Sequence, residues 1–562
     1  MLNRVNINSK EQTLIIYVLL ALVTLAAFWQ VNHYDFVFDD TIYVTENIYI
    51  RHGIFWEGIR WAFSTTHAEF WHPLTWLTLL SDYQLFGFNA GGYHMNNLVL
   101  HILSTLLLFW LFKRMTGAVW KSAFVAAVFA LHPLHVESVA WIAERKDVLS
   151  AFFWMLTLCL YVYYTEKPAT GRYLLVLFCF VLALMSKPMV ITLPLIMIIL
   201  DYWPLDRLDT EKGNLIFWQL KEKAPFFILS AVFSFITICA RYKPYGKAFQ
   251  FSLSSRLANA LDSLVAYLAK TFWPSDMAVF YPFPAQIQGW KVFGAFSLLL
   301  VISVAVTVMW KRLPYFFVGW LWYMIAIAPV LGIIKVGDFA MADRYHYLPS
   351  IGITIMLAWG MPILLEKAGI RKNILFPGAV ALLLILAVLT WHQCGYWKNN
   401  TSLFSHALRV TEDNYLAHNN FGLALFNQGK SEEAIEHYNE SIRINSDYVY
   451  AYNNRGIIYG ERRQYQLAMR DFNEAIRRMP VYADAYNNRG FTYAELGHYQ
   501  RAIEDYNMAI HWKPDYAEAY MNRGVAYFKQ GNNTLGCLDA QKACALGNCK
   551  TLESARRIRL CR

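Results

Sequence analysis

Long apolar stretches alternate with short polar loops over the first 394 residues of the chain. Uncharged runs of about 18 to 22 residues have the length that a helix needs to cross the core of a bilayer. The first run, residues 14–31, is long for a signal peptide and lacks a convincing cleavage site, so we interpret it as a retained anchor. In all we predict about eleven membrane spans, near residues 13–31, 95–112, 119–132, 148–164, 172–186, 188–202, 224–240, 290–310, 313–333, 349–365 and 374–393.

Charges near these spans predict their orientation. An odd number of spans places the two chain ends on opposite sides, and loops such as those carrying Lys113 and Arg114 or Lys311 and Arg312 then share one face. The positive-inside rule makes that face cytoplasmic. Segment 256–273 carries Asp262 and Lys270 and is interpreted as an amphipathic helix at the outer interface. We therefore predict a cytoplasmic N-terminus, with the first outer loop and the C-terminal region on the non-cytoplasmic side, periplasmic or lumenal.

Beyond residue 395 the chain becomes polar and repetitive. Glycines recur every 34 residues, and small, aromatic and proline residues recur in step with them: Gly422, Gly456, Gly490 and Gly524, Ala434, Ala468 and Ala502, Tyr438, Phe472 and Tyr506, and Pro480 and Pro514. This is the period of the tetratricopeptide repeat, a pair of antiparallel helices whose stacking leaves a concave groove. Three full units and one decayed unit are predicted.

The two patterns predict an all-α protein. A polytopic membrane domain of about eleven spans covers residues 1–394 and includes an outer loop at 32–94. A linker with a first helix follows at 395–414, the tetratricopeptide α-solenoid at 415–548, and a C-terminal cap at 549–562.

The composition and net charge of the chain limit the classes of binding partner that we expect. The chain is 57% hydrophobic with a formal net charge of +10, but the basic residues are scattered through loops. Anionic lipid or a phosphate group is therefore a better counterpart than nucleic acid, which we do not expect as a partner. Four cysteines cluster at the C-terminus, where a disulfide and a zinc site are both open, although the spacing fits no strong zinc motif: Cys537, Cys544, Cys549 and Cys561.

Adjacent carboxylates follow the first span, at Asp39 and Asp40 in the stretch VNHYDFVFDDTIYV. Such a pair is often only a solvated helix end or a cap. It also suits catalysis, because a Ser or Thr hydroxyl needs a carboxylate within reach to accept its proton. Charge on a departing phosphate in turn requires Arg or Lys donors.

Several motifs carry a family resemblance. They are FDD after the first span, WHPLTWL at 71–77, GYHMNNLVLH at 92–101, HPLHVESVAWIAERKDVLS at 132–150 and ADRYHYLPSIG at 342–352, followed by the repeats. Over essentially the whole chain, these resemble the transmembrane and tetratricopeptide-repeat O-mannosyltransferases of the C-type glycosyltransferase superfamily.

The resemblance implies an enzyme that takes a sugar, such as mannose, from a polyprenyl phosphate on the outer side and passes it to a protein hydroxyl. It makes Asp39 and Asp40 catalytic, the first acid acting as base, and single displacement would invert the anomeric centre. Animal relatives have Arg where this chain has His72, so a fixed positive charge is missing. The donor-binding candidates are Arg145 and Arg344, then Lys146 and Lys187, together with Glu137 and His72. Glu137 and Asp147 flank Arg145.

These basic residues can also have roles that do not involve a sugar donor. Arg145 and Arg344 can pair with Asp147 and Asp343 or bind lipid headgroups, and Lys187 can be an interfacial anchor. We expect no cofactor and no obligatory metal, although adjacent acids can hold a divalent ion. Scattered histidines are interpreted as hydrogen-bonded structural groups: His72, His94, His101, His132 and His135.

An asparagine stands two residues before each marker glycine, on the first helix of each unit: Asn420, Asn454, Asn488 and Asn522. An amide side chain offers a donor and an acceptor, so this ladder can hold an extended acceptor peptide in the groove. Asparagine is also common at this position of the repeat for structural reasons. Arg455, Arg489 and Arg523, one residue on, make that surface basic or are merely solvated.

Two other functions compete with a protein glycosyltransferase. One is a membrane-tethered, non-catalytic scaffold that uses the repeats for envelope assembly. The other is a lipid-linked oligosaccharide ligase or polymerase with a different donor. The sequence shows neither the sugar nor the acceptor.

Overall fold

The computed structural model describes residues 9–207, 215–241, 251–284, 286–334, 339–367 and 372–561. The described part is helical, and its only β feature is an isolated bridge between Pro282 and Phe339. The chain divides into two compact units, Met1–Leu403 and Phe404–Arg562. Residues 1–8, which carry the predicted cytoplasmic N-terminus, lie outside the described residues.

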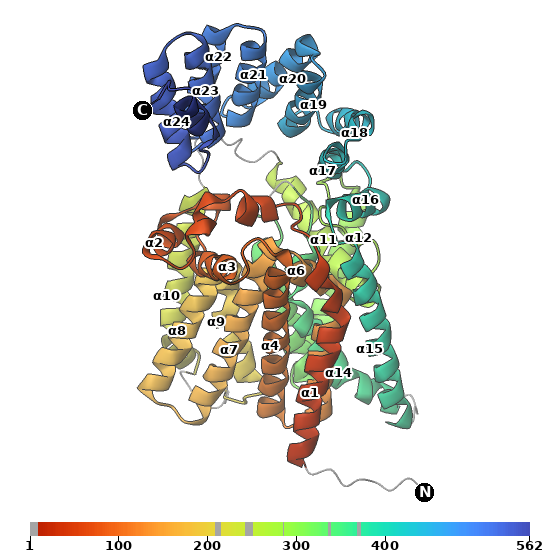
Figure 1. Cartoon of the computed structure of the whole chain (residues 1–562). Helices are drawn as coiled ribbons and strands as arrows, with labels where there is room; N and C mark the ends of the chain where they lie inside the picture. Colours follow the sequence, from red (N-terminus) through yellow and green to blue (C-terminus); the bar gives the residue numbers. More distant parts are fainter. Residues whose placement is uncertain are drawn as a thin grey trace, which may run out of the picture. The chain divides into compact units, whose positions relative to one another are not determined.

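The first unit is a membrane helical domain (Figure 1). Within the described residues, six helices are long and apolar enough to cross a membrane, and a helix pair bent by 55° gives a seventh. With four shorter apolar helices, these overlap the eleven predicted spans. The helices are α1 (Ser9–Phe28), α4 (Ala90–Thr116), α5 (Val119–Leu131), α7 (Arg145–Glu166), α8 (Thr170–Ser186), α9 (Leu193–Tyr202), α10 (Leu215–Arg241), α12 (Gly289–Val308), α13 (Pro314–Ile327), α14 (Ser350–Lys367) and α15 (Lys372–Gly395).

The loop at 32–94, predicted to be an outer loop, contains two α-helices, α2 (Trp56–Ser64) and α3 (Pro73–Phe86). They run across one end of the membrane helices, and α3 contacts α4, α7 and α8 (Figure 1). Pro73 begins α3 at a position where its missing N–H costs nothing. The short helix α6 (Val136–Ala140) lies at the same end, so this end gathers the loop motifs.

Segment 256–273 forms helix α11 (Leu253–Phe272), which is not among the candidate spans found in the described residues. One face packs against α12 and α13 through Ala260, Leu264 and Tyr267, while Leu257 and Phe272 are exposed. This amphipathic helix is the pattern expected of a segment lying at an interface.

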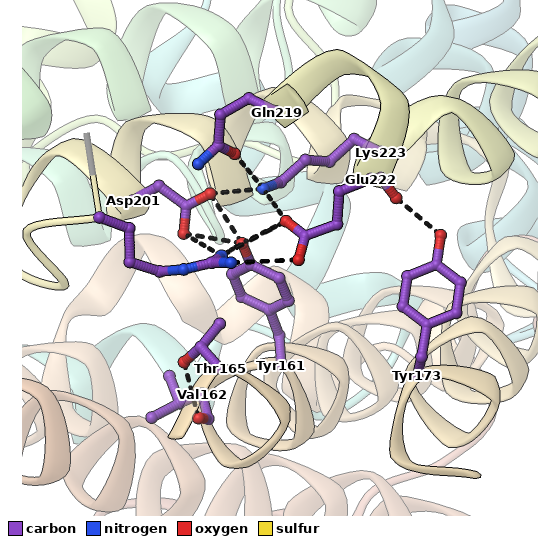
Figure 2. Close-up of polar contacts among 9 residues, drawn as sticks. Tyr161, Val162, Thr165, Tyr173, Asp201, Gln219, Glu222 and Lys223 are labelled. Atoms are coloured by element: carbon purple, nitrogen blue, oxygen red, sulfur yellow. Dashed lines mark hydrogen bonds and ion pairs between the residues drawn. The ribbon is translucent and has the colours of Figure 1, made fainter. Parts of the chain in front are cut away.

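A buried polar cluster joins α7, α9 and α10 about 24 Å along α7 from its start. Figure 2 shows the Asp201 carboxylate accepting hydrogen bonds from the Tyr161 hydroxyl at 2.7 Å and from Lys223. Arg207 pairs with Asp201 at 2.9 Å and with Glu222 at 3.1 Å. Asp201 and Lys223 are fully buried. Because the charges balance and are mutually satisfied, the cluster acts as a clamp between the three helices.

We expect Lys223→Met to destabilise the membrane unit by about 3–5 kcal/mol, because it leaves the two acids Asp201 and Glu222 with Arg207 as their one remaining cation in the cluster. The midpoint of thermal unfolding of the purified chain in detergent, followed by tryptophan fluorescence, measures the effect. Lys221→Met is the matched control, since Lys221 is exposed on the same helix. Equal midpoints for the two variants would contradict the clamp.

The second unit is the tetratricopeptide solenoid, built from four helix pairs after α16 (Asn400–Val410). The pairs are α17 (Tyr415–Phe426) with α18 (Ser431–Ile444), α19 (Val449–Glu461) with α20 (Tyr465–Arg478), α21 (Ala483–Glu495) with α22 (Tyr499–Trp512), and α23 (Ala517–Lys529) with α24 (Asn533–Ala545). The marker glycines allow the close approach within a pair: a Cβ at Gly456 would lie 2.7 Å from the Phe472 ring.

Helix α25 (Lys550–Arg557) follows the last pair and packs on α24 through Leu552 and Ala555. The four C-terminal cysteines form two disulfides here, Cys537 with Cys561 and Cys544 with Cys549. The first of them ties α24 to the segment that follows α25.

Candidate active site

Asp40 fixes the outer loop onto the membrane unit. Its carboxylate accepts the backbone N–H of Val37 at 2.9 Å and that of Ala143 at 2.7 Å, and the side chain is fully buried. Burial raises the pKa of Asp40 to about 8, although the two N–H donors favour the ionised form. Both oxygens are therefore engaged, one within the turn of Asp40 itself and the other with the segment that precedes α7.

The surroundings of the Asp39 side chain differ from those of Asp40. Its side chain is partly exposed, and no described residue donates a hydrogen bond to its carboxylate or forms an ion pair with it. Burial raises the pKa of Asp39, and the charges of Lys146 and Arg344 oppose that rise. The structure thus leaves the Asp39 oxygens free to accept a proton, as a general base must, and the charges of Lys146 and Arg344 act on this carboxylate.

Three basic side chains converge on Glu144, which is 2% exposed. Its carboxylate pairs with Lys146 at 3.0 Å, with Lys187 at 3.4 Å and with the Arg344 Nε at 3.2 Å. Lys187 also pairs with Asp147. We call these bases, with Glu144, the basic cluster. It brings together three of the predicted donor-binding residues, from α7, from the turn after α8 and from the segment before α14.

Further contacts hold Arg344 in place. Glu137 accepts the backbone N–H of Arg344 at 2.9 Å and also pairs with its guanidinium. The guanidinium carbon lies 5.3 Å from the Trp141 ring centroid. Asp343, predicted as an alternative partner, instead accepts a hydrogen bond from the Tyr281 hydroxyl at 2.8 Å. Glu137 is thus a positioning residue for Arg344.

Arg145 does not join the basic cluster. Its guanidinium pairs with Asp82 of α3 at 2.6 Å, bonds the Asn97 amide, and donates to the Tyr93 carbonyl at 2.9 Å. The side chain is 1% exposed. The structure places this predicted donor-binding residue in a clamp between α3, α4 and α7.

His72 lies in an aromatic cluster next to the basic cluster. Its ring stacks on Tyr43 with centroids 6.0 Å apart, and the Tyr43 hydroxyl accepts a hydrogen bond from Lys146 at 3.3 Å. Burial and the nearby Lys146 charge lower the pKa of His72 well below its ordinary value, so the ring is neutral. Its buried Nε2 has no hydrogen-bond partner among the described residues. A neutral, unpartnered nitrogen can serve a sugar hydroxyl but cannot replace a fixed positive charge.

Among the described residues, no group of three or more His, Cys, Asp and Glu side chains is arranged to hold a metal ion. Three histidines of the loop motifs bond other residues of the membrane unit: His101 with the Tyr347 hydroxyl at 2.6 Å, His132 with the Thr271 carbonyl at 3.0 Å and His135 with the Phe129 carbonyl at 2.6 Å. The Asp39–Asp40 pair offers one free carboxylate, since the oxygens of Asp40 are taken.

The predicted asparagine ladder runs along the first helices of the repeats. Asn454 donates to Asn419 at 3.0 Å, and the same bond recurs from Asn488 to Asn453 and from Asn522 to Asn487. Asn420 instead donates to the Leu416 carbonyl at 2.9 Å. One N–H of each ladder amide therefore serves the solenoid itself, and its second N–H remains for a ligand.

The arginines that follow these asparagines are neither free nor merely solvated. Each forms a two-pronged ion pair with an aspartate sixteen residues later: Arg455 with Asp471, Arg489 with Asp505 and Arg523 with Asp539, at 2.6–2.8 Å. These pairs link the two helices of the second, third and fourth units, so they are structural.

Sequence reasoning missed three residues of this end of the molecule. Glu144 lies within the motif at 132–150, but nothing in the sequence distinguishes it from the other charged residues of that motif. Tyr43 and Asp82 lie far along the chain from the residues they contact. Only the folded structure brings these side chains together.

Comparison with known proteins supports the resemblance. The family described as dolichyl-phosphate-mannose-protein mannosyltransferase matches residues 73–211, and the TPR repeat matches 422–462 and 492–531. A protein O-mannosyl-transferase of Caenorhabditis elegans is 25% identical over 72% of this chain and 59% of its own length. One of Homo sapiens is 25% identical over 72% of this chain and 52% of its own. The resemblance to the transmembrane and tetratricopeptide-repeat O-mannosyltransferase family is confirmed.

The chain spans 59% and 52% of the length of these two family relatives. The mannosyltransferase match includes Glu137, Glu144, Lys146 and Lys187 but neither Asp39 nor Arg344. Among solved structures, the crystal structure of MamA aligns with 28% of this chain and 88% of its own, at 25% sequence identity and a TM-score of 0.24.

Proposed function

We propose that this chain is an integral membrane glycosyltransferase that moves a sugar, mannose in the first instance, from a polyprenyl phosphate to Ser or Thr hydroxyls of a protein acceptor. The observation that carries the proposal is the free Asp39 carboxylate beside the basic cluster. The names of the relatives, protein O-mannosyl-transferases, support the sugar and the kind of acceptor.

In the proposed mechanism, Asp39 accepts the proton of the acceptor hydroxyl as its oxygen attacks the anomeric carbon. The bond from that carbon to the lipid phosphate oxygen breaks, and the electron pair leaves with the phosphate. Arg344, Lys146 and Lys187 stabilise this charge. The products are an O-glycosylated acceptor with inverted anomeric configuration, a polyprenyl phosphate and a protonated Asp39. The proposal includes no metal ion, because Arg and Lys side chains can bind a monophosphate leaving group.

Sidedness is part of the proposal. The base-rich loops favour a cytoplasmic N-terminus, which puts the outer loop and the repeats on the non-cytoplasmic side. The two C-terminal disulfides support this, because disulfides persist in oxidising compartments. The four free cysteines all belong to the membrane unit: Cys159, Cys179, Cys239 and Cys394.

The test is transfer by the purified full chain in nanodiscs. We expect proteins from the non-cytoplasmic compartment to gain the mass of one hexose when polyprenyl-phosphate mannose is supplied, with inverted configuration by NMR. The reaction is run with and without a chelator, and equal rates are expected. If acceptors keep their mass while the chain still binds them, the scaffold interpretation replaces this one; transfer only from a lipid-linked oligosaccharide would indicate the ligase.

A further inference from the structure

The first helices of the repeats form the inner side of the solenoid. They contact one another from unit to unit, α17 with α19, α19 with α21 and α21 with α23, and the asparagine ladder bonds them directly. Helices that approach each other more closely lie on the concave side of a curved stack. The exposed face of these helices is therefore the groove.

An apolar side chain stands on this face in every unit, three residues after the ladder asparagine. In three units it is markedly exposed: Leu423 at 39%, Phe491 at 52% and Val525 at 42%. Ile457 occupies the same place in the second unit and is partly exposed. Apolar side chains that recur at a 34-residue period and are left open to solvent indicate a contact surface rather than a core.

Acidic side chains border these apolar positions. In the third unit Asp484, Asn488, Phe491 and Glu495 are spaced by four, three and four residues, so they form one stripe along α21. We use the name groove stripe for these four positions of α21 together with the positions that lie 34 or 68 residues away in the other three units.

The groove stripe carries four acids and one base: Glu461, Asp484, Glu495 and Glu518 against Lys529. No described basic residue forms an ion pair with any of these acids, unlike Asp471, Asp505 and Asp539, which are paired with arginine. The groove thus presents unneutralised negative charge beside exposed apolar side chains.

We propose that the groove stripe binds an extended polypeptide in which aliphatic and basic side chains recur. Packed helices lie about 8–10 Å apart, and an extended chain advances about 3.1–3.4 Å per residue. Roughly three residues of the bound peptide therefore span the distance from one unit to the next. An aliphatic side chain at every third position then meets one apolar residue of each unit. Basic side chains between them face the acids, and the free amide groups of the ladder bond the peptide backbone. This inference specifies the acceptor of the proposed function and rests on it.

Binding is measured without any sugar donor, by fluorescence anisotropy, on the full chain in nanodiscs of zwitterionic lipid with empty nanodiscs as blank. The probes are repeating Leu-Lys-Ser, Leu-Glu-Ser and Ser-Lys-Ser peptides of equal length. We expect the Leu-Lys-Ser peptide to bind at least about tenfold more tightly than either other peptide, and to weaken as salt is raised.

The double variant Glu461→Lys with Glu495→Lys should weaken Leu-Lys-Ser binding about tenfold or more and favour the Leu-Glu-Ser peptide. Phe491→Ser should weaken binding of both leucine peptides alike. Glu504→Lys makes the same charge change on an exposed residue of the second helix of the third unit and should bind as the unchanged chain does.

Equal binding of the three peptides, or a double variant that behaves like Glu504→Lys, would overturn the inference. The two proposals fail separately. If the Leu-Lys-Ser peptide binds but mannosylation is never seen with any acceptor, the enzymatic proposal fails and the docking surface stands. If mannosylation occurs but ignores the groove stripe variants, the docking surface fails and the enzyme stands.

Discussion

Asp39→Asn is expected to lower the rate of sugar transfer by about 10²–10⁴-fold while leaving the chain folded. The substitution keeps the shape of the side chain and removes its capacity to accept a proton. No described residue bonds the Asp39 carboxylate, so no structural contact is lost with the charge. Initial rates of labelled-mannose transfer to a saturating acceptor measure the loss, and the thermal unfolding midpoint checks the fold.

Asp40→Asn is the matched control, because it makes the same chemical change one residue away. There an amide nitrogen would face one of the N–H donors of Val37 and Ala143, which costs about 1–3 kcal/mol of stability. Its unfolding midpoint should fall, and its rate per folded molecule should fall much less than that of Asp39→Asn. A folded Asp40 variant without activity beside an active Asp39 variant would reverse the two roles.

The spans and the repeats could be predicted because both are local patterns. The length of an apolar run can be read directly from the sequence, and each predicted span overlaps a helix. The repeat period likewise places Gly456 against Phe472, since the same contact between glycine and an aromatic ring recurs in the first three units. Neither inference needs a contact between distant parts of the chain.

The site could be predicted only in part, because its contacts are long-range. Arg145 and Lys146 are adjacent in sequence, but neighbouring helical positions point about 100° apart, so one faces Asp82 and the other Glu144. Nothing local distinguishes them. The roles of Asp39 and Asp40 separate for a similar reason, since Ala143 takes an oxygen of the second from 103 residues away.

The repeat arginines show a signal that was present in the sequence. Asp471, Asp505 and Asp539 share the 34-residue period of Arg455, Arg489 and Arg523, so each pair has the same offset in three units. A repeated offset between opposite charges predicts a structural ion pair. The three arginines are therefore not available to bind a ligand in the groove. What remains there is acidic and apolar.

Arg344→Gln is expected to lower transfer by about 10²–10³-fold and to move the acid limb of the pH–rate profile to higher pH. The positive charge of Arg344 opposes the burial that raises the pKa of Asp39. The base acts only when ionised, so activity is lost as pH falls through its pKa. Removing the cation raises that pKa further, and activity is then lost at a higher pH.

The shift of the acid limb separates this role from a structural one. Arg145→Gln breaks the buried pair with Asp82 and should lower the unfolding midpoint, but it should leave the acid limb in place, because Arg145 lies outside the basic cluster. Arg344→Lys retains the charge and should restore the limb while recovering only part of the rate, since lysine cannot hold two phosphate oxygens at once. An acid limb that moves with Arg145→Gln and not with Arg344→Gln would assign the phosphate to the other arginine and contradict the basic cluster as the site of transfer.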